Sequence, residues 1–390
     1  MLPLFLLFLA ATESPTQILQ RGLVALQHGD LVHARAAFEE VAKQDPQNAF
    51  AWASLAETYL QLKQPAAAAS AAVKAEKFGG DNPIIGHGLA MYFAKTGEFK
   101  HAAELERKFA ASGRADPEAE LRVADLFLEG GDATDALSAA ERAIAQHSSP
   151  EAENVLGRAL LATGKPEEGR AHLSAGWQGA KTDPHLAFDY AQVLLRREAF
   201  AEAAEVLNTS LPAHPDDAQL VLALGVARYG QRRFEDAIAA FLKVIRIDPQ
   251  VEQPYVFLGK MLDQAGNRLP EIATAYERWS VRKPRNALGP LLLAKARLAR
   301  DSKDGTAEGL LRRSIALDDA NWEAHYELGV LLEGKHDWLA ASKELRRGAE
   351  LDEKQAMPHY HLARVYDRLG ETEKAKEERA VHERLTGGAK

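Results

Sequence analysis

Residues 218–251 read AQLVLALGVARYGQRRFEDAIAAFLKVIRIDPQV, and the pattern of this stretch recurs along the chain. Two runs of helix-forming residues are separated by a short break and followed by Asp248 and Pro249. A small residue stands within each run, at Gly225 and at Ala237. Only a residue without a long side chain fits where two helix axes approach closely. The stretch therefore predicts two antiparallel helices that are joined by a short turn.

Small residues at these two positions recur about every 34 residues. The first series consists of Gly22, Ala56, Ala90, Ala124, Gly157, Ala191, Gly225, Gly259, Ala294, Gly329 and Ala363. The second series follows 12 to 14 residues behind and consists of Ala34, Ala68, Ala102, Ala136, Gly169, Ala203, Ala237, Ala273, Ala307, Ala341 and Ala375. A period that is unbroken over eleven units indicates a repeat architecture, in which each unit packs on the next.

Proline and glycine mark the expected ends of these helices. Prolines at a similar spacing, most of them after Asp or Asn, suit turns that lead into a helix start. They are Pro46, Pro83, Pro117, Pro150, Pro184, Pro215, Pro249 and Pro284. Glycines suited to end a helix mark the turn within the repeat. They are Gly29, Gly97, Gly131, Gly164, Gly266 and Gly370.

The large residues of the repeat follow a pattern of their own. The second repeat contains Trp52, Leu55, Ala56, Tyr59 and Ala68, and the last contains Leu362, Ala363, Tyr366, Gly370 and Ala375. With this pattern the chain resembles the tetratricopeptide repeat family. The resemblance implies an all-α fold, a right-handed superhelical solenoid of about eleven helix-turn-helix repeats. The ninth repeat departs from the pattern because it has no aromatic residue at the expected places.

The repeat positions divide the chain into three expected segments. An apolar segment occupies residues 1–13, the solenoid residues 14–385 and a short tail residues 386–390. We expect the repeats near residues 15–48, 49–82, 83–116, 117–149, 150–183, 184–217, 218–251, 252–286, 287–321, 322–355 and 356–385. The charged last helix, residues 371–385, has the polar face that a terminal cap needs.

Charge and composition narrow the class of partner. The formal net charge is −8 at pH 7, and no stretch dense in Lys and Arg is interleaved with aromatic residues. We therefore expect no nucleic-acid partner. The chain contains no cysteine, which excludes disulfides, thiol catalysis, cysteine-ligated zinc and a lipid-anchored cysteine.

The first eleven residues, MLPLFLLFLAA, form a short and almost purely apolar run. The run is too short to span a bilayer, for which about 20 residues are needed. It resembles the apolar part of a secretory signal, with Ala10 and Ala11 near a cleavage point, although no Lys or Arg precedes it. We therefore expect an exported protein that is periplasmic or secreted. It is either free or associated with the envelope, and its mature chain has no membrane span. The alternative is a cytoplasmic protein.

Motifs for catalysis, cofactors and metals are lacking in the sequence. It contains no H-E-x-x-H, no G-x-G-x-x-G, no phosphate loop and no G-x-S-x-G. His359 and His361 are two residues apart, so they point to different sides of a helix and cannot share a metal ion. We expect the histidines at the surface or at the edge of a groove. The prediction is a protein without catalytic residues, cofactor or metal.

A partner is expected on the concave surface. In the resembled family, the first helices of the repeats form a groove that binds extended peptides or helices of partner proteins. By register, the residues expected there are Asn154, Arg158, Phe188, Gln192 and Arg196, and further along Tyr326, Tyr360, Arg364 and Arg368. Both sets combine an aromatic ring with Arg, and Arg364 and Arg368 lie one turn apart, which suits a carboxylate or an acidic segment. The alternative is that these are ordinary polar residues of the groove with no dedicated ligand.

The sequence thus predicts a non-catalytic scaffold that binds a partner peptide or helix and assists the assembly of a complex. A first alternative is the separately encoded substrate-recognition arm of a transferase or secretion machine. Weak catalysis would require a carboxylate cluster in the groove, whereas acids such as Glu57, Asp125 and Asp263 are isolated in the sequence. A second alternative is a self-assembling solenoid or homodimer, since Leu19 and Leu23 make the first repeat apolar.

Overall fold

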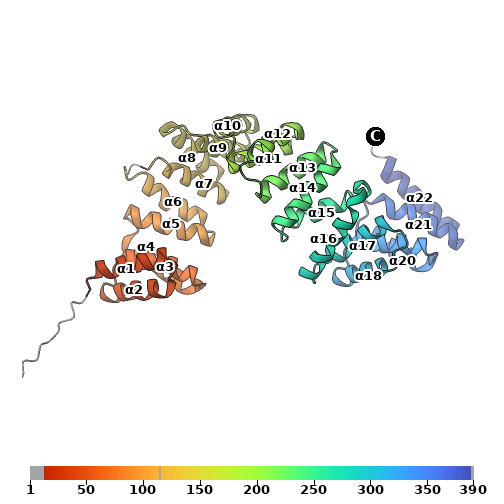
Figure 1. The fold of residues 1–390 in the computed structure, drawn as a ribbon, viewed down its shortest axis with the longest axis horizontal. Helices are drawn as coiled ribbons and strands as arrows, with labels where there is room; N and C mark the ends of the chain where they lie inside the picture. Colours follow the sequence, from red (N-terminus) through yellow and green to blue (C-terminus); the bar gives the residue numbers. More distant parts are fainter. Residues whose placement is uncertain (1–12, 114–115, 388–390) are drawn as a thin grey trace, which may run out of the picture. The chain divides into compact units, whose positions relative to one another are not determined.

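The computed structural model describes residues 13–113 and 116–387, and within these residues the chain is entirely helical. Twenty-two α-helices and two short 3₁₀ helices follow one another, and the described residues contain no strand (Figure 1). This confirms the predicted all-α fold of paired helices. Most of the expected apolar segment 1–13, and the last three residues of the expected tail, lie outside the described residues.

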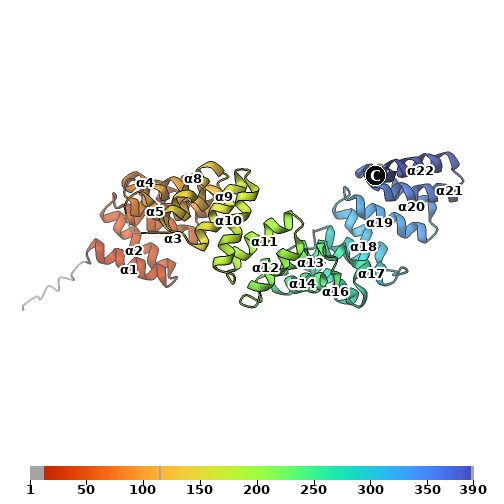
Figure 2. The same cartoon turned by 90° about the horizontal axis from the view of Figure 1, so that it is seen from above.

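The helices fall into two compact units that meet between Tyr190 and Ala191, within α11. The first unit contains α1 (Pro15–Gln27), α2 (Leu31–Gln44), α3 (Ala49–Gln61), α4 (Pro65–Gly79), α5 (Pro83–Thr96), α6 (Phe99–Ala110), α7 (Ala119–Glu129), α8 (Ala133–Gln146), α9 (Pro150–Ala162), α10 (Pro166–Gly179) and the first part of α11 (Pro184–Arg196). Within this unit each odd-numbered helix from α1 to α9 packs against the even-numbered helix that follows it (Figure 2).

Most of the second unit repeats the arrangement of paired helices. It contains α12 (Phe200–Ser210), α13 (Ala218–Gly230), α14 (Phe234–Ile247), α15 (Gln253–Gly259), α16 (Leu269–Arg282), α17 (Leu288–Arg300), α18 (Ala307–Leu317), α19 (Trp322–Gly334), α20 (Trp338–Leu351), α21 (Ala356–Leu369) and α22 (Thr372–Gly387). The odd-numbered helices are the first helices of their repeats, and the even-numbered ones are the second helices.

Helix starts follow local capping chemistry. Ser14 forms a capping box with Gln17 at the start of α1, and the Asn48 side chain accepts a hydrogen bond from the amide of Ala51 at the start of α3. Proline is the first residue of α5 and of α9. Proline lacks a backbone N–H, which costs nothing at this position because the first N–H groups of a helix have no partner within the helix. These signals place helix starts close to the linkers between repeats.

The turn within the repeat requires a backbone of positive φ. Glycine supplies it at Gly29, Gly97, Gly131, Gly164 and Gly370. At the same place in other repeats stand Lys63, Glu198, Arg232 and His336, with φ between 58° and 64°. Side chains are strained in this region, but the tight turn between two packed helices imposes it. Glycine alone therefore does not mark every turn.

The small residues lie where the two helices of a repeat touch. A Cβ atom added to Gly22 would lie 2.6 Å from the ring of Phe38, and one added to Gly329 would lie 2.6 Å from Leu345. A Cβ atom added to Gly157 or Gly225 would meet a bulky residue in the same way. In each case that residue stands sixteen positions further along the chain. The close approach of helix axes that the sequence predicts is confirmed at these repeats.

The eighth repeat departs from the regular pattern. Its first helix, α15, has only 7 residues and is followed by two 3₁₀ helices, Leu262–Gln264 and Gly266–Arg268. This repeat has an aromatic core, in which the rings of Tyr255 and Trp279 stack with centroids 4.4 Å apart. Tyr276 donates a hydrogen bond to the carbonyl of Tyr255 within the same core.

At the end of the described chain, α22 buries only Ala375, as a cap requires. Among the described residues, no helix has the length and apolarity needed to cross a bilayer.

Candidate functional site

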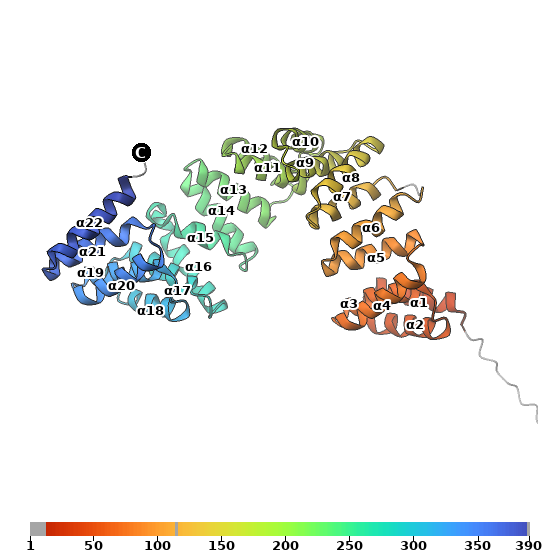
Figure 3. The same cartoon turned by 180° about the vertical axis from the view of Figure 1, so that it is seen from behind.

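Four of the residues expected in a groove lie on two neighbouring helices of the second unit. Tyr326 lies on α19, and Tyr360, Arg364 and Arg368 follow one another at intervals of four on α21. Residues four apart share one face of a helix. The two helices contact each other directly. Figure 3 shows them within the last two helix pairs of the chain. The structure thus brings this predicted set together on one surface, which we call the α19/α21 surface.

An aromatic cluster joins the two helices at this surface. The ring of His361 lies 5.7 Å from the ring of Tyr326 and 5.3 Å from the ring of Tyr360, with both pairs close to perpendicular. The guanidinium of Arg364 lies 5.6 Å from the centre of the Tyr360 ring. Tyr360 is 42% exposed, so a rigidly supported aromatic ring is presented to solvent.

A buried carboxylate contacts two residues of this cluster. Glu333, near the end of α19, is only 7% exposed. It accepts a hydrogen bond from Nδ1 of His361 at 2.5 Å and forms an ion pair with Nη2 of Arg364 at 3.2 Å. A carboxylate that is withdrawn from water needs such partners. Glu333 therefore ties α19 to α21 and holds Arg364 in position.

A pocket of about 550 Å³ opens beside this ion pair. Its lining includes Val330, Glu333, Trp338, His361, Arg364 and Arg368. The tight turn between α19 and α20 contributes His336, and its ring centre lies 5.0 Å from that of Trp338, the first residue of α20. The pocket therefore combines an aromatic wall with two guanidinium groups.

One of the charged groups of the pocket lacks an ion-pair partner among the described residues. Arg364 is paired with Glu333, and Asp367 is paired with Arg379. Arg368 is exposed and has no ion-pair partner within the described part of the chain. It is therefore available to a carboxylate or other anion from outside.

Tyr326 keeps its proton at this surface. Burial raises the pKa of the Tyr326 hydroxyl to about 12, and the neighbouring carboxylates of Glu327 and Glu333 act in the same direction. Tyr326 is thus a neutral hydrogen-bond donor at any physiological pH.

The first expected set is divided between the two units. Asn154, Arg158 and Phe188 belong to the first unit, and Gln192 and Arg196 to the second. Asn154 is buried, Phe188 and Gln192 are half-buried, and Arg196 is exposed.

Arg158 is already engaged by acids of its own unit. It lies 2.7 Å from Asp125 and 3.9 Å from both Glu129 and Asp189. Burial raises the pKa of Asp125 and of Asp189, and Arg158 opposes the rise in both. The expectation that Asp125 is isolated is therefore wrong, because α7, α9 and α11 bring three acids around one arginine.

The expectation that the histidines lie at the surface or at the edge of a groove is wrong for His325, whereas the similarly buried His361 does line the pocket at the α19/α21 surface. His325 and His361 are 6% and 9% exposed. Each has a carboxylate partner that sequence reasoning missed, Glu344 for His325 and Glu333 for His361. Burial of an imidazole is tolerated when its N–H has such a partner.

A signal for some of these pairs exists in the sequence. Four repeats contain a His and a Glu that are nineteen residues apart and whose side chains meet between the two helices of the repeat. These pairs are His87–Glu106, Glu153–His172, His325–Glu344 and His359–Glu378, at 2.6 to 2.7 Å. The common spacing could have been found by aligning the repeats.

Comparison with known families agrees with this architecture. Two family models described as tetratricopeptide repeat match residues 25–86, 121–184 and 188–252. The chain belongs to the tetratricopeptide repeat family. Tetratricopeptide repeat proteins generally mediate protein–protein interactions, and they are typically non-catalytic scaffolds. No curated protein matches the chain.

Several solved tetratricopeptide repeat structures are similar to the chain at low identity. Yeast Tom70 has 13% identity and a TM-score of 0.42, with 95% of this chain and 92% of that chain covered. The APC/C hetero-tetramer Cut9–Hcn1 has 15% identity and a TM-score of 0.43, with 97% and 88% covered. The C-terminal part of a repeat protein from Cytophaga hutchinsonii has 16% identity and a TM-score of 0.44, with 70% and 98% covered. None of these bears on the partner of this chain.

Proposed function

We propose that this protein is a non-catalytic scaffold that binds a peptide or helix of a partner protein on the α19/α21 surface. The observation that carries the proposal is the row of exposed Tyr360, Arg364 and Arg368 beside a pocket of about 550 Å³. Tyr and Arg are the residue types in which interface binding energy is concentrated. Their support from Glu333 and His361 reduces the conformational entropy that binding would cost.

The pocket chemistry selects the kind of segment that binds. Arg368 has no acid of its own among the described residues, so it would donate a bidentate hydrogen bond to a carboxylate of the partner. Trp338 and Tyr360 would contact an apolar or aromatic side chain next to that carboxylate. We therefore propose a partner segment with an acidic group beside a large apolar residue.

The test begins with identification of the partner. The full-length protein carrying a C-terminal tag is expressed in its own host, crosslinked and purified, and proteins recovered in equal amount are identified by mass spectrometry. The affinity of the purified partner is then measured for the wild type, Arg368→Glu and Arg347→Glu. We expect Arg368→Glu to weaken binding by about 2 kcal/mol, roughly thirtyfold. Arg347 is half-buried on α20 and lies outside the pocket, so Arg347→Glu should leave the affinity unchanged. Equal affinities for both variants would contradict the proposed surface.

We further propose that the scaffold is exported and takes part in the assembly of a complex. The support is the apolar run of residues 2–9 followed by Ala10 and Ala11 in the sequence. Sequencing the N-terminus of the mature protein tests this proposal. A chain that starts between residues 11 and 14 agrees with export, whereas a mature protein that starts at Met1 and remains in the cytoplasm contradicts it.

Self-association is a second candidate function, because apolar side chains of the first repeat are exposed. Val32 is 60% exposed, and Leu23 and Val24 are exposed nearby in sequence, on α1. Exposed apolar groups of this kind are often found at interfaces. Sedimentation at increasing concentration should then show a dimer, and Val32→Glu should abolish it. A mass that stays at one chain throughout contradicts self-association.

A further inference from the structure

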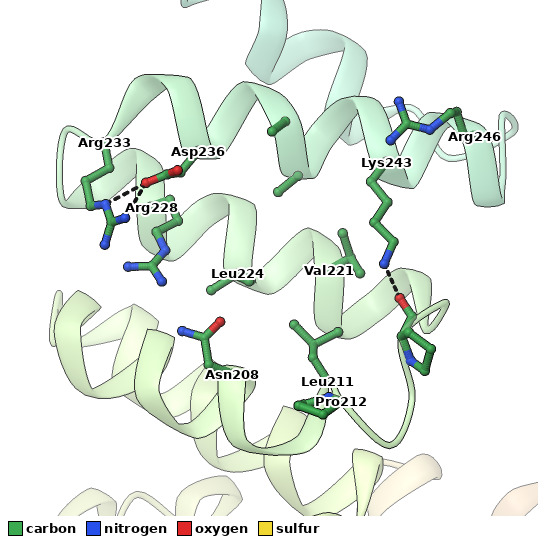
Figure 4. A pocket seen from close by; sticks show the side chains of 13 residues that line it. Asn208, Leu211, Pro212, Val221, Leu224, Arg228, Arg233, Asp236, Lys243 and Arg246 are labelled. Atoms are coloured by element: carbon green, nitrogen blue, oxygen red, sulfur yellow. Dashed lines mark hydrogen bonds and ion pairs between the residues drawn. The ribbon is translucent and has the colours of Figure 1, made fainter.

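A second pocket lies in the second unit between α12, α13 and α14 (Figure 4). Its volume is about 590 Å³. Two of its three helices, α12 and α14, are the second helices of their repeats, whereas the α19/α21 surface is formed by first helices. The pocket is therefore separate from the α19/α21 surface, and a ligand bound in it would be independent of the proposed function.

The middle of this pocket is apolar. Val221 and Leu224 of α13 and Leu211 at the end of α12 point into it (Figure 4). On α14 the facing residues are Ala239 and Ala240, whose small side chains leave the space open. An apolar hollow between helices is suited to one large apolar side chain.

Cations stand at both ends of the hollow. Arg228 and Arg233 lie at one end with Asp236, and Lys243 and Arg246 lie at the other (Figure 4). Arg233 is paired with Asp236, and Asp236 is the one acid that lines the described pocket. The pocket is thus strongly basic in a chain whose net charge is −8.

The individual partners of these cations leave them open to a ligand. Arg228 donates to the amide oxygen of Gln231 at 3.1 Å rather than to an acid. Arg246 lies 3.3 Å from Glu271, and the Arg246 side chain is 62% exposed. Lys243 donates to the carbonyl of Pro215 and lies 3.7 Å from Asp216. Exposed pairs of this kind are weak and exchange readily.

The spacing of the two ends indicates the form of the ligand. Arg233 and Lys243 are ten residues apart, which is roughly 15 Å at a rise of 1.5 Å per helical residue. A phosphate or other small anion would need cations that converge on one point. An extended peptide covers the same distance in about five residues at roughly 3.3 Å each. We propose that this pocket binds an extended peptide segment that places an apolar side chain in the middle and carboxylates on both sides.

The test uses a labelled peptide and the full-length protein. The probe is the fluorescein-labelled peptide Glu-Asp-Leu-Leu-Asp-Glu with an amidated C-terminus, and its binding is followed by fluorescence anisotropy. We expect saturable binding and a loss of about tenfold in affinity when Arg228→Ala and Arg246→Ala are combined, because one cation is removed at each end. A peptide with Lys and Arg in place of the acids should not bind.

Two control variants locate the peptide. Arg313→Ala removes an exposed cation of α18 outside the pocket and should leave the affinity unchanged. The pocket variants are also measured with Arg368→Ala added, because the α19/α21 surface is itself proposed to bind an acidic segment, and the loss that they cause should persist. Circular dichroism checks that each variant is folded. If the double variant is unfolded, peptide binding is measured with the single variants Arg228→Ala and Arg246→Ala instead. The inference is overturned if the acidic peptide does not bind, if Arg313→Ala weakens binding as much as the pocket variants, or if only Arg368→Ala weakens it.

Discussion

Glu333 shows how one residue can connect fold and function. Its carboxylate is buried, yet it holds both His361 and Arg364 of the neighbouring repeat. The sequence identified Arg364 as a surface residue of interest but not the acid that positions it. The reason is physical, because Glu333 and His361 are on different helices and their contact depends on how two repeats stack. Aromatic and arginine residues of a groove follow from the repeat register, whereas their internal partners do not.

A first prediction concerns this buried ion pair. Glu333→Gln should lower the free energy of unfolding by about 2 kcal/mol, because His361 and Arg364 lose their charged partner. Urea denaturation followed by circular dichroism measures the change. The matched control is Glu353→Gln, at an exposed site, which should change the stability by less than about 0.5 kcal/mol. An effect of Glu333→Gln no larger than that of the control would show that the pair does not join the repeats.

A second prediction concerns the pH dependence of stability. The hydrogen bond from His325 lowers the pKa of the Glu344 carboxyl, and burial opposes the shift. A lowered folded-state pKa means that the stabilisation is present above the ordinary value of 4.5 and is lost as the pH falls below it. The stability difference between the wild type and Glu344→Gln should therefore be larger at pH 6 than at pH 3.5. A difference that grows toward pH 3.5 would contradict this assignment.

At the scale of the helix, the repeat depends on close contacts of small residues. The two series of Gly and Ala in the sequence predicted where first and second helices touch, and the contacts of Gly22, Gly157, Gly225 and Gly329 confirm this. Two features escaped prediction. Non-glycine residues such as Lys63 and His336 adopt positive φ, because the turn geometry overrides their preference. The shortening of α15, which lies beside a core of stacked aromatic rings, is visible only in the tertiary structure.

A third prediction tests these contacts. In Gly329→Ala the new methyl group would meet Leu345 at 2.6 Å, so the two helices must separate slightly. We expect destabilisation by about 1–3 kcal/mol despite the better helix propensity of alanine. A methyl group added at Gly309, in α18 of the same unit, would have no atom within 4 Å, so Gly309→Ala should be neutral or stabilising by up to about 1 kcal/mol. Thermal unfolding of both variants measures the change. If Gly329→Ala is no less stable than Gly309→Ala, the helices are not closely packed at position 329.

At the scale of the whole molecule, the paired helices provide surfaces rather than a single enclosed site. The α19/α21 surface presents aromatic and guanidinium groups, and the pocket between α12, α13 and α14 presents an apolar hollow with basic ends. The repeat register predicted the residues of the first surface. It did not indicate the second, because that pocket depends on the space left by small side chains between helices.

Site-specific photocrosslinking tests the central claim most directly. A photoreactive phenylalanine analogue replaces Tyr360 at the α19/α21 surface or Leu339, which is exposed on α20 and outside the pocket. Each full-length variant is irradiated in its native host, and the crosslinked products are identified by mass spectrometry. We predict one protein product that is specific to position 360 and that disappears when Arg368→Glu is added. The same products at both positions, or a product at position 360 that persists in Arg368→Glu, would contradict binding of a partner at this surface.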